Sequence, residues 1–137
     1  MGVAATLLLT WVSLPLAAPA PRAQILPFTA ATPDTNAQAV KDMEGLYRDA
    51  MQRVLGERVV GGGQVREELA MAAKDNPVLR TVTAENVKYL PGLFNGGPLH
   101  VTEVKGDYPD LRVTFRSFDG VTRALLASHV ERFTAPP

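Results

Sequence analysis

A hairpin signal near the C-terminus places the strongest constraint on what this chain can fold into. Apolar and polar residues alternate over residues 111–118, as in a strand with one buried face. Asp119-Gly120 follows, a dipeptide typical of the two-residue type I′ turn between antiparallel strands. A returning strand is predicted over residues 121–128, and residues 129–133 are expected to form a short final turn or strand. We therefore expect an antiparallel sheet in this part of the chain.

Upstream segments also have the composition of strands. Residues 99–105 lie between the turn-rich stretches PGLFNGGP and GDYPD, which marks them as a strand. Residues 78–83 and 87–90 are rich in β-branched side chains, and each is predicted to be a short strand. The sheet is therefore expected to hold about four or five short strands.

Two helices are predicted before these strands. In residues 36–55 the apolar positions recur with helical spacing on one face: Val40, Met43, Tyr47, Ala50 and Val54. Asp34 or Thr35 is expected to cap this helix. A shorter helix over residues 64–74 begins after a triple glycine and ends at Asn76-Pro77. Because the apolar face is short, we expect the first helix to pack on its own domain.

This order of elements predicts an α+β protein with a small antiparallel sheet or an SH3-like barrel. A helix packed on a curved sheet has the same order of elements. The expected organisation is a signal peptide or membrane anchor over residues 1–20, a proline-rich linker over 21–34, an α+β domain over 35–133 and a tail over 134–137.

The N-terminal stretch has the character of a membrane or export segment. Residues 3–18 form an apolar run, longer than most signal-peptide cores and shorter than the roughly 20 residues that span a bilayer. Ala18-Pro19-Ala20 has the small-x-small shape of a cleavage site. The first cation, Arg22, lies after the run, which favours an uncleaved anchor with the domain on the cytoplasmic side. Cleavage would instead give an exported domain, periplasmic or otherwise outside the cytoplasm, and both interpretations stay open.

Composition excludes several classes of function. The 137 residues contain no cysteine, so disulfides, thiolate nucleophiles and cysteine zinc sites are impossible within them. Lys plus Arg equals Asp plus Glu at 14 each, which argues against nucleic acid as a partner. The 46% hydrophobic content is that of a folded chain.

One face of the predicted hairpin is rich in arginine. A two-residue turn would place Arg116 directly opposite Arg123, where like charges destabilise the sheet unless acids or a bound anion compensate. The predicted binding residues on this face are Arg112, Arg116, Arg123 and Phe118. The acids that could pair with the arginines within the chain are Glu85, Glu103 and Asp107. Internal pairing and an anion-binding surface are the two interpretations of this face.

No catalytic motif is found, and no cofactor is expected. His100, His129 and Glu131 are a weak alternative for a metal site, because their spacing matches no metal-binding motif. The serines lie in no nucleophile motif.

These observations favour a non-enzymatic protein, exported or membrane-anchored, that acts as an accessory or structural subunit. It would bind a protein partner or membrane complex, with anionic lipid headgroups as a further contact. The alternative is a small-molecule-binding or enzymatic domain whose pocket lies between the first helix and the sheet. In that case Tyr47, His100 and His129 would supply the polar groups.

Overall fold

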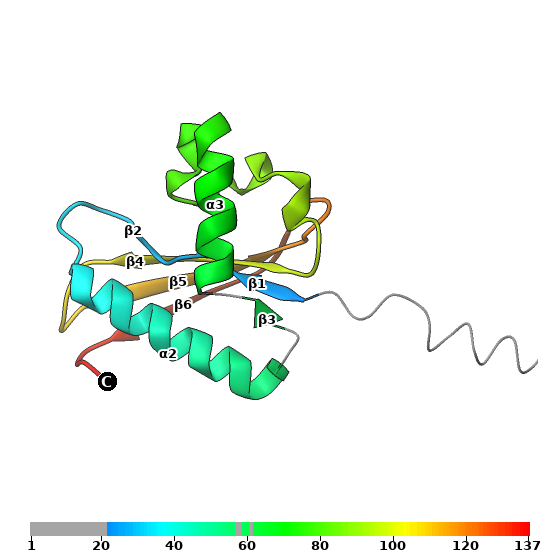
Figure 1. The fold of residues 1–137 in the computed structure, drawn as a ribbon. Helices are drawn as coiled ribbons and strands as arrows, with labels where there is room; N and C mark the ends of the chain where they lie inside the picture. The colour runs from blue at the N-terminus through cyan, green and yellow to red at the C-terminus, as the bar shows by residue number, and fades with distance from the viewer. Residues whose placement is uncertain (1–21, 57–58, 61) are drawn as a thin grey trace, which may run out of the picture.

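The computed structural model describes residues 22–56, 59–60 and 62–137, in which two α-helices cover opposite faces of one mixed sheet (Figure 1). The segment predicted as a signal peptide or anchor, residues 1–20, lies outside the described residues. The elements in chain order are β1 (Ala23–Ile25), β2 (Thr29–Ala30), α2 (Ala37–Leu55), β3 (Val59–Val60), α3 (Gly63–Asp75), the 3₁₀ helices η2 (Pro77–Arg80), η3 (Val87–Tyr89) and η4 (Gly92–Phe94), β4 (Leu99–Lys105), β5 (Leu111–Phe118) and β6 (Leu125–Phe133).

The sheet is open and mixed. Its strand order is β3-β1-β4-β5-β6, and β2 pairs with β4 beside β1. β1 lies parallel to both β3 and β4, whereas β4, β5 and β6 are antiparallel. The α+β class with two helices is confirmed. The SH3-like barrel and the purely antiparallel sheet were wrong, because β1, β2 and β3 add parallel strands and the described strands do not close into a barrel.

The stretch predicted as a proline-rich linker, residues 21–34, contains β1 and β2 instead. The backbone N–H of Gln24 donates to the carbonyl of Pro98 at 2.9 Å, and that of Leu26 donates to the carbonyl of His100 at 3.0 Å. All three residues of β1 are buried. The prolines indicate extended backbone, which suits a strand as well as a linker. A strand of three residues is too short to show alternation, so its pairing could not be read from the sequence.

The two helices lie where periodicity placed them, and only the cap of the first differs. The side-chain oxygen of Asn36 accepts the backbone N–H groups of Gln38 at 3.0 Å and Ala39 at 3.1 Å, so Asn36 is the N-cap of α2. Asp34 and Thr35 were the predicted caps. The Thr35 hydroxyl is turned toward the backbone of β4 instead. Among the described residues, neither helix has the length and apolar character needed to cross a bilayer.

Each face of the sheet carries its own hydrophobic cluster. Figure 1 shows α3 over one face of the sheet and α2 over the other. The cluster on the α3 side includes Leu26, Val65, Leu69, Phe94, Leu99, Val101 and Phe118. The cluster on the α2 side includes Ile25, Phe28, Met43, Val104, Leu111 and Val113. β4 contributes Leu99 and Val101 to one cluster and Val104 to the other, so this strand is covered on both faces.

Residues 78–83 and 87–90 were predicted to be strands. This prediction was wrong, because these stretches contain the 3₁₀ helices η2 and η3. The side chain of Asn86 organises this region. Its amide oxygen accepts the N–H of Thr83 at 2.7 Å, and its nitrogen donates to the carbonyl of Thr81 at 2.7 Å. These bonds close the backbone into turns, and such local competition overrides the strand preference of β-branched residues.

The hairpin between β5 and β6 has a longer loop than the predicted two-residue turn. The Asp119 carboxylate accepts the backbone N–H groups of Val121 and Thr122, both at 2.8 Å, and these bonds lower the pKa of Asp119. Asp119 N–H donates to the carbonyl of Ala124 at 2.8 Å, and β6 begins only at Leu125. The predicted register was therefore wrong.

Gly120 has a packing role in this loop. An added Cβ at Gly120 would lie 2.3 Å from the carbonyl oxygen of Gly97. Glycine is therefore required for close approach of two backbones. Its φ is not positive, as a type I′ turn would demand.

Candidate functional site

Arg123, predicted to lie on the binding face, supports the loop from within. Its guanidinium donates to the side-chain oxygen of Asn95 and to the carbonyls of Leu90 and Pro91, the last two at 3.4 Å. Burial lowers its pKa, and the carboxylate of Asp119 opposes that shift. Arg123 therefore ties the β5–β6 loop to the segment before β4.

Phe118 and Arg116 do not lie on an open surface, as had been predicted for both. Phe118 is only 6% exposed and belongs to the α3-side cluster. Arg116 lies opposite Val101 on β4 and Ser128 on β6, so it does not face Arg123. Arg116 is half-buried and lines a hollow together with Glu85 and Glu103, two of the acids considered as its internal partners.

Arg112 does lie on an exposed basic surface, but with other residues than those predicted. The sheet register places Lys105 of β4 directly opposite Arg112 of β5, and Arg112 directly opposite Arg132 of β6. All three side chains are exposed. We name Lys105, Arg112 and Arg132 the basic row.

Two carboxylates lie near this row. Hydrogen bonds from Thr32 and from its own backbone lower the pKa of Asp34, and the charge of Lys105 adds to that shift. Asp110 lies 3.4 Å from Nε of Arg112 and 2.8 Å from Nε of Arg132. Like charges directly opposite on neighbouring strands repel, and two acids beside three cations leave one positive charge uncompensated. Exposed ion pairs of this kind contribute only about 0–1 kcal/mol each. The basic row can therefore take a further carboxylate or phosphate without first breaking a strong internal interaction.

Sequence reasoning missed Lys105 and Arg132 because both depend on the sheet register. With the predicted two-residue turn, the end of β6 would not have lain opposite Arg112. The longer loop shifts the register of β6, so that Arg132 lies opposite Arg112.

A second cluster of polar side chains lies between α2 and the sheet. The Tyr47 hydroxyl is 3.3 Å from Nδ1 of His100, and the ring of His129 stacks on Phe115 at 6.5 Å between centroids. These four side chains line a cavity of about 160 Å³. Burial lowers the pKa of His100 and raises that of Tyr47, which keeps both groups neutral near pH 7. The structure thus brings together the three polar residues of the alternative hypothesis.

The weak metal alternative is not supported by the geometry. His129 and Glu131 form a pair at 2.7 Å, with both side chains more than half exposed. His100 is instead half-buried beside Tyr47. No group of three His, Asp or Glu side chains arranged to hold a metal ion occurs in the part of the chain that the structure describes.

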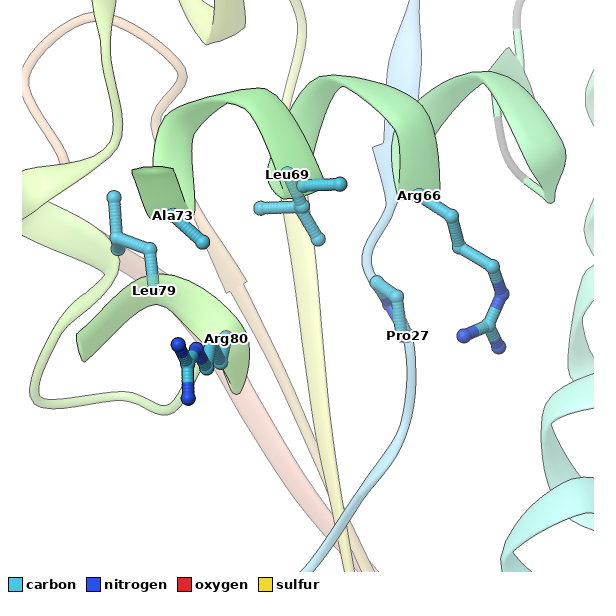
Figure 2. A pocket seen from close by; sticks show the side chains of 7 residues that line it. Pro27, Arg66, Leu69, Ala73, Leu79 and Arg80 are labelled. Carbon is cyan, nitrogen blue, oxygen red and sulfur yellow. The ribbon is translucent and has the colours of Figure 1, made fainter. Parts of the chain in front are cut away.

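A third feature is an apolar groove beneath α3. It measures about 270 Å³, and Leu69, Ala73 and Leu79 line it. Figure 2 shows Arg66 and Arg80 at different ends of the groove. Arg66 is paired with Glu44 of α2, so the groove carries little free charge at that end.

Comparison with known proteins identifies the fold only. No protein-family model matches the chain, and no curated protein sequence matches it. Lipoprotein GNA1162 from Neisseria meningitidis matches with a TM-score of 0.61 and 14% identity, over 84% of this chain and 81% of that one. The LpoB C-terminal domain from Escherichia coli gives 0.61 and 11%, over 92% and 94%. That of Salmonella enterica gives 0.58 and 10%, over 88% and 87%. At these identities the chain shares their fold.

Proposed function

We propose that this chain is a non-enzymatic accessory protein, exported or membrane-anchored, that binds a protein partner through an acidic segment of that partner. Its fold is shared with a solved lipoprotein and with two LpoB C-terminal domains, which supports a place outside the cytoplasm or at a membrane. The apolar run over residues 3–18 supports the same location.

The membrane attachment that we propose for this chain is not a lipid on a cysteine side chain. The 137 residues contain no cysteine, so no lipid can be carried on a cysteine side chain within them. If the protein is held at a membrane, the apolar run itself is the anchor we propose. Cleavage of that run would give a free exported domain.

The basic row is the observation that carries the partner proposal. Arg112 and Arg132 present planar guanidinium groups that can hold carboxylates with two parallel hydrogen bonds. Lys105 adds a flexible cation beside them. A partner segment with two or more acidic residues would relieve the repulsion along the row, so the charge pattern selects an acidic ligand.

The test is binding of a fluorescent oligo-glutamate peptide to the full chain in nonionic detergent. We expect Lys105→Glu/Arg112→Glu to weaken binding by about tenfold or more, because attraction becomes repulsion. The matched control is Lys41→Glu/Arg53→Glu on α2, which makes the same change in net charge at exposed positions. Equal losses in both variants would contradict the proposal, since net charge alone would then explain binding.

A parallel measurement separates protein from lipid as the source of acid. Vesicles containing phosphatidylglycerol are mixed with the same variants, and co-sedimentation is measured. Binding of the vesicles without binding of the peptide would overturn the protein-partner proposal and favour an anionic lipid surface.

The second candidate function is a ligand site at the Tyr47–His100 cavity. The convergence of Tyr47, His100 and His129 favours it. Its volume of about 160 Å³ is below the roughly 300–1,000 Å³ of most small-molecule sites. Ligand-observed NMR with a fragment library, repeated on His129→Ala and Tyr47→Phe, tests it; hits that survive both substitutions would exclude this cavity as their site.

A further inference from the structure

The outer strand of the sheet is long and uncovered. β6 has nine residues, of which eight are exposed and the last, Phe133, is half-buried. Leu125, Leu126 and Val130 are 55%, 57% and 57% exposed. Within the described residues β6 pairs with β5 on one side and with no strand on the other.

An edge of this kind favours the addition of another strand, because its outward backbone N–H and C=O groups have no partner in the sheet. β6 is irregular only at its start, where the register with β5 shifts next to Phe118. From Ala127 to Phe133 the pairing with β5 is continuous. This stretch is long enough to accept a complete strand of average length.

We propose that β6 pairs antiparallel with β6 of a second copy of this chain, about a two-fold axis at Val130. In this register Val130 faces its own copy across the axis, and His129 faces Glu131 of the second copy. Ser128 faces Arg132 of the second copy. The two sheets then form one continuous sheet, which gives every outward backbone group between these residues a hydrogen-bond partner.

Side-chain complementarity favours this register, because the imidazole of His129 can hydrogen-bond to a carboxylate. His129 and Glu131 point to the same face of β6, and their side chains already contact each other at 2.7 Å. Pairing about Val130 places each of them opposite the other residue of the second copy, twice by symmetry. An axis at Glu131 or Arg132 would instead place like charges directly opposite each other. An axis at Ser128 would place Glu131 against Leu125.

The chain offers a direct test, because it has no cysteine. Val130→Cys introduces one thiol on the proposed axis, where the two Cα atoms would lie about 4.5–5.5 Å apart. That separation is within the range of a disulfide. We expect the full-length variant, in nonionic detergent with a mild oxidant, to form covalent dimers at least about tenfold faster than a random encounter allows.

Two matched variants make the result decisive. Ser128→Cys lies on the same strand and face, but its two copies would be offset by four residues along the strands, too far for a disulfide. Val121→Cys lies in the β5–β6 loop at a position 65% exposed and reports random encounter. Faster cross-linking of Ser128→Cys than of Val130→Cys would overturn the register, and equal rates in all three variants would overturn the pairing.

The oligomeric state of the protein in solution gives an independent readout. Sedimentation velocity should show a concentration-dependent dimer for the full chain and a monomer for Val130→Lys, in which two ammonium groups would meet on the axis. Circular dichroism should show an unchanged fold, because the Val130 side chain is exposed. An unaltered dimer in Val130→Lys would contradict the proposal.

Discussion

β4 and β6 both pair with β5, yet they lie in opposite environments. In β4 four of the seven residues are buried, and the strand lies between both helices with β1 and β2 on its other side. In β6 no residue is buried. Both strands contain several apolar side chains, so composition alone does not separate them. The difference arises because two helices can cover only the middle of the sheet.

This contrast divides the molecule into a part that holds the fold and a part that is free to bind. Truncations on β4 should cost stability, whereas those on β6 should affect association.

The largest effect is expected from the same truncation made on each strand. Leu99→Ala in β4 removes a side chain that is 0% exposed and should lower the free energy of unfolding by about 2–5 kcal/mol. Leu126→Ala in β6, where the side chain is 57% exposed, should lower it by no more than about 0.5 kcal/mol. Urea unfolding followed by circular dichroism measures both. Similar losses would show that β6 is covered in the native protein, by a partner or by its own copy.

A smaller effect is expected from substituting two arginines, one in the part that holds the fold and one in the part that is free to bind. Arg123→Ala leaves the Leu90 and Pro91 carbonyls and the Asn95 amide without their donor and should cost about 1–3 kcal/mol. Arg112→Ala removes only an exposed ion pair with Asp110 and should cost less than about 1 kcal/mol. The same urea titration compares them, and an equal cost would contradict the loop-supporting role of Arg123.

The smallest effect is a pH dependence at His100 on β4. Burial lowers the pKa of His100 in the folded chain below the ordinary value of 6.5, so the unfolded chain takes up the proton first. Stability is therefore unaffected well above pH 6.5 and falls as the pH drops below it, until the folded state is protonated as well. The difference between the unfolding curves of the native chain and His100→Asn should shrink over this window. A constant difference would mean that His100 has an ordinary pKa.

Periodicity predicted the parts of the fold that are long and regular. α2 and β5 lie where their apolar periodicity placed them, and β4 lies between the two turn-rich stretches that marked it as a strand. The sequence does not reveal the pairing of β1, since three residues show no period. Nor does it reveal the turns around Asn86, whose side chain replaces strand pairing with local hydrogen bonds.

The candidate site was predicted only in part, and a single loop explains why. An Asp-Gly pair is a good signal for a tight hairpin, but here the Asp119 carboxylate binds two backbone N–H groups and lengthens the loop. Every cross-strand neighbour of Arg112 and Arg116 on β6 changes with it. Arg112 remained on the surface, while Arg132 could be assigned to the basic row only from the observed register.

The place of β1 limits how far the domain can stand from a membrane. If residues 21–34 were a fully extended linker, the domain could lie up to about 50 Å from the end of an anchor. The sheet instead begins at Ala23, so only residues 19–22 separate it from the apolar run. Four residues span at most about 14 Å. A chain retained by that run would hold the start of β1 near the bilayer surface. Gln24 pairs with Leu99 at the beginning of β4, whereas Lys105 ends that strand, so the basic row would lie at the end of the sheet far from the bilayer.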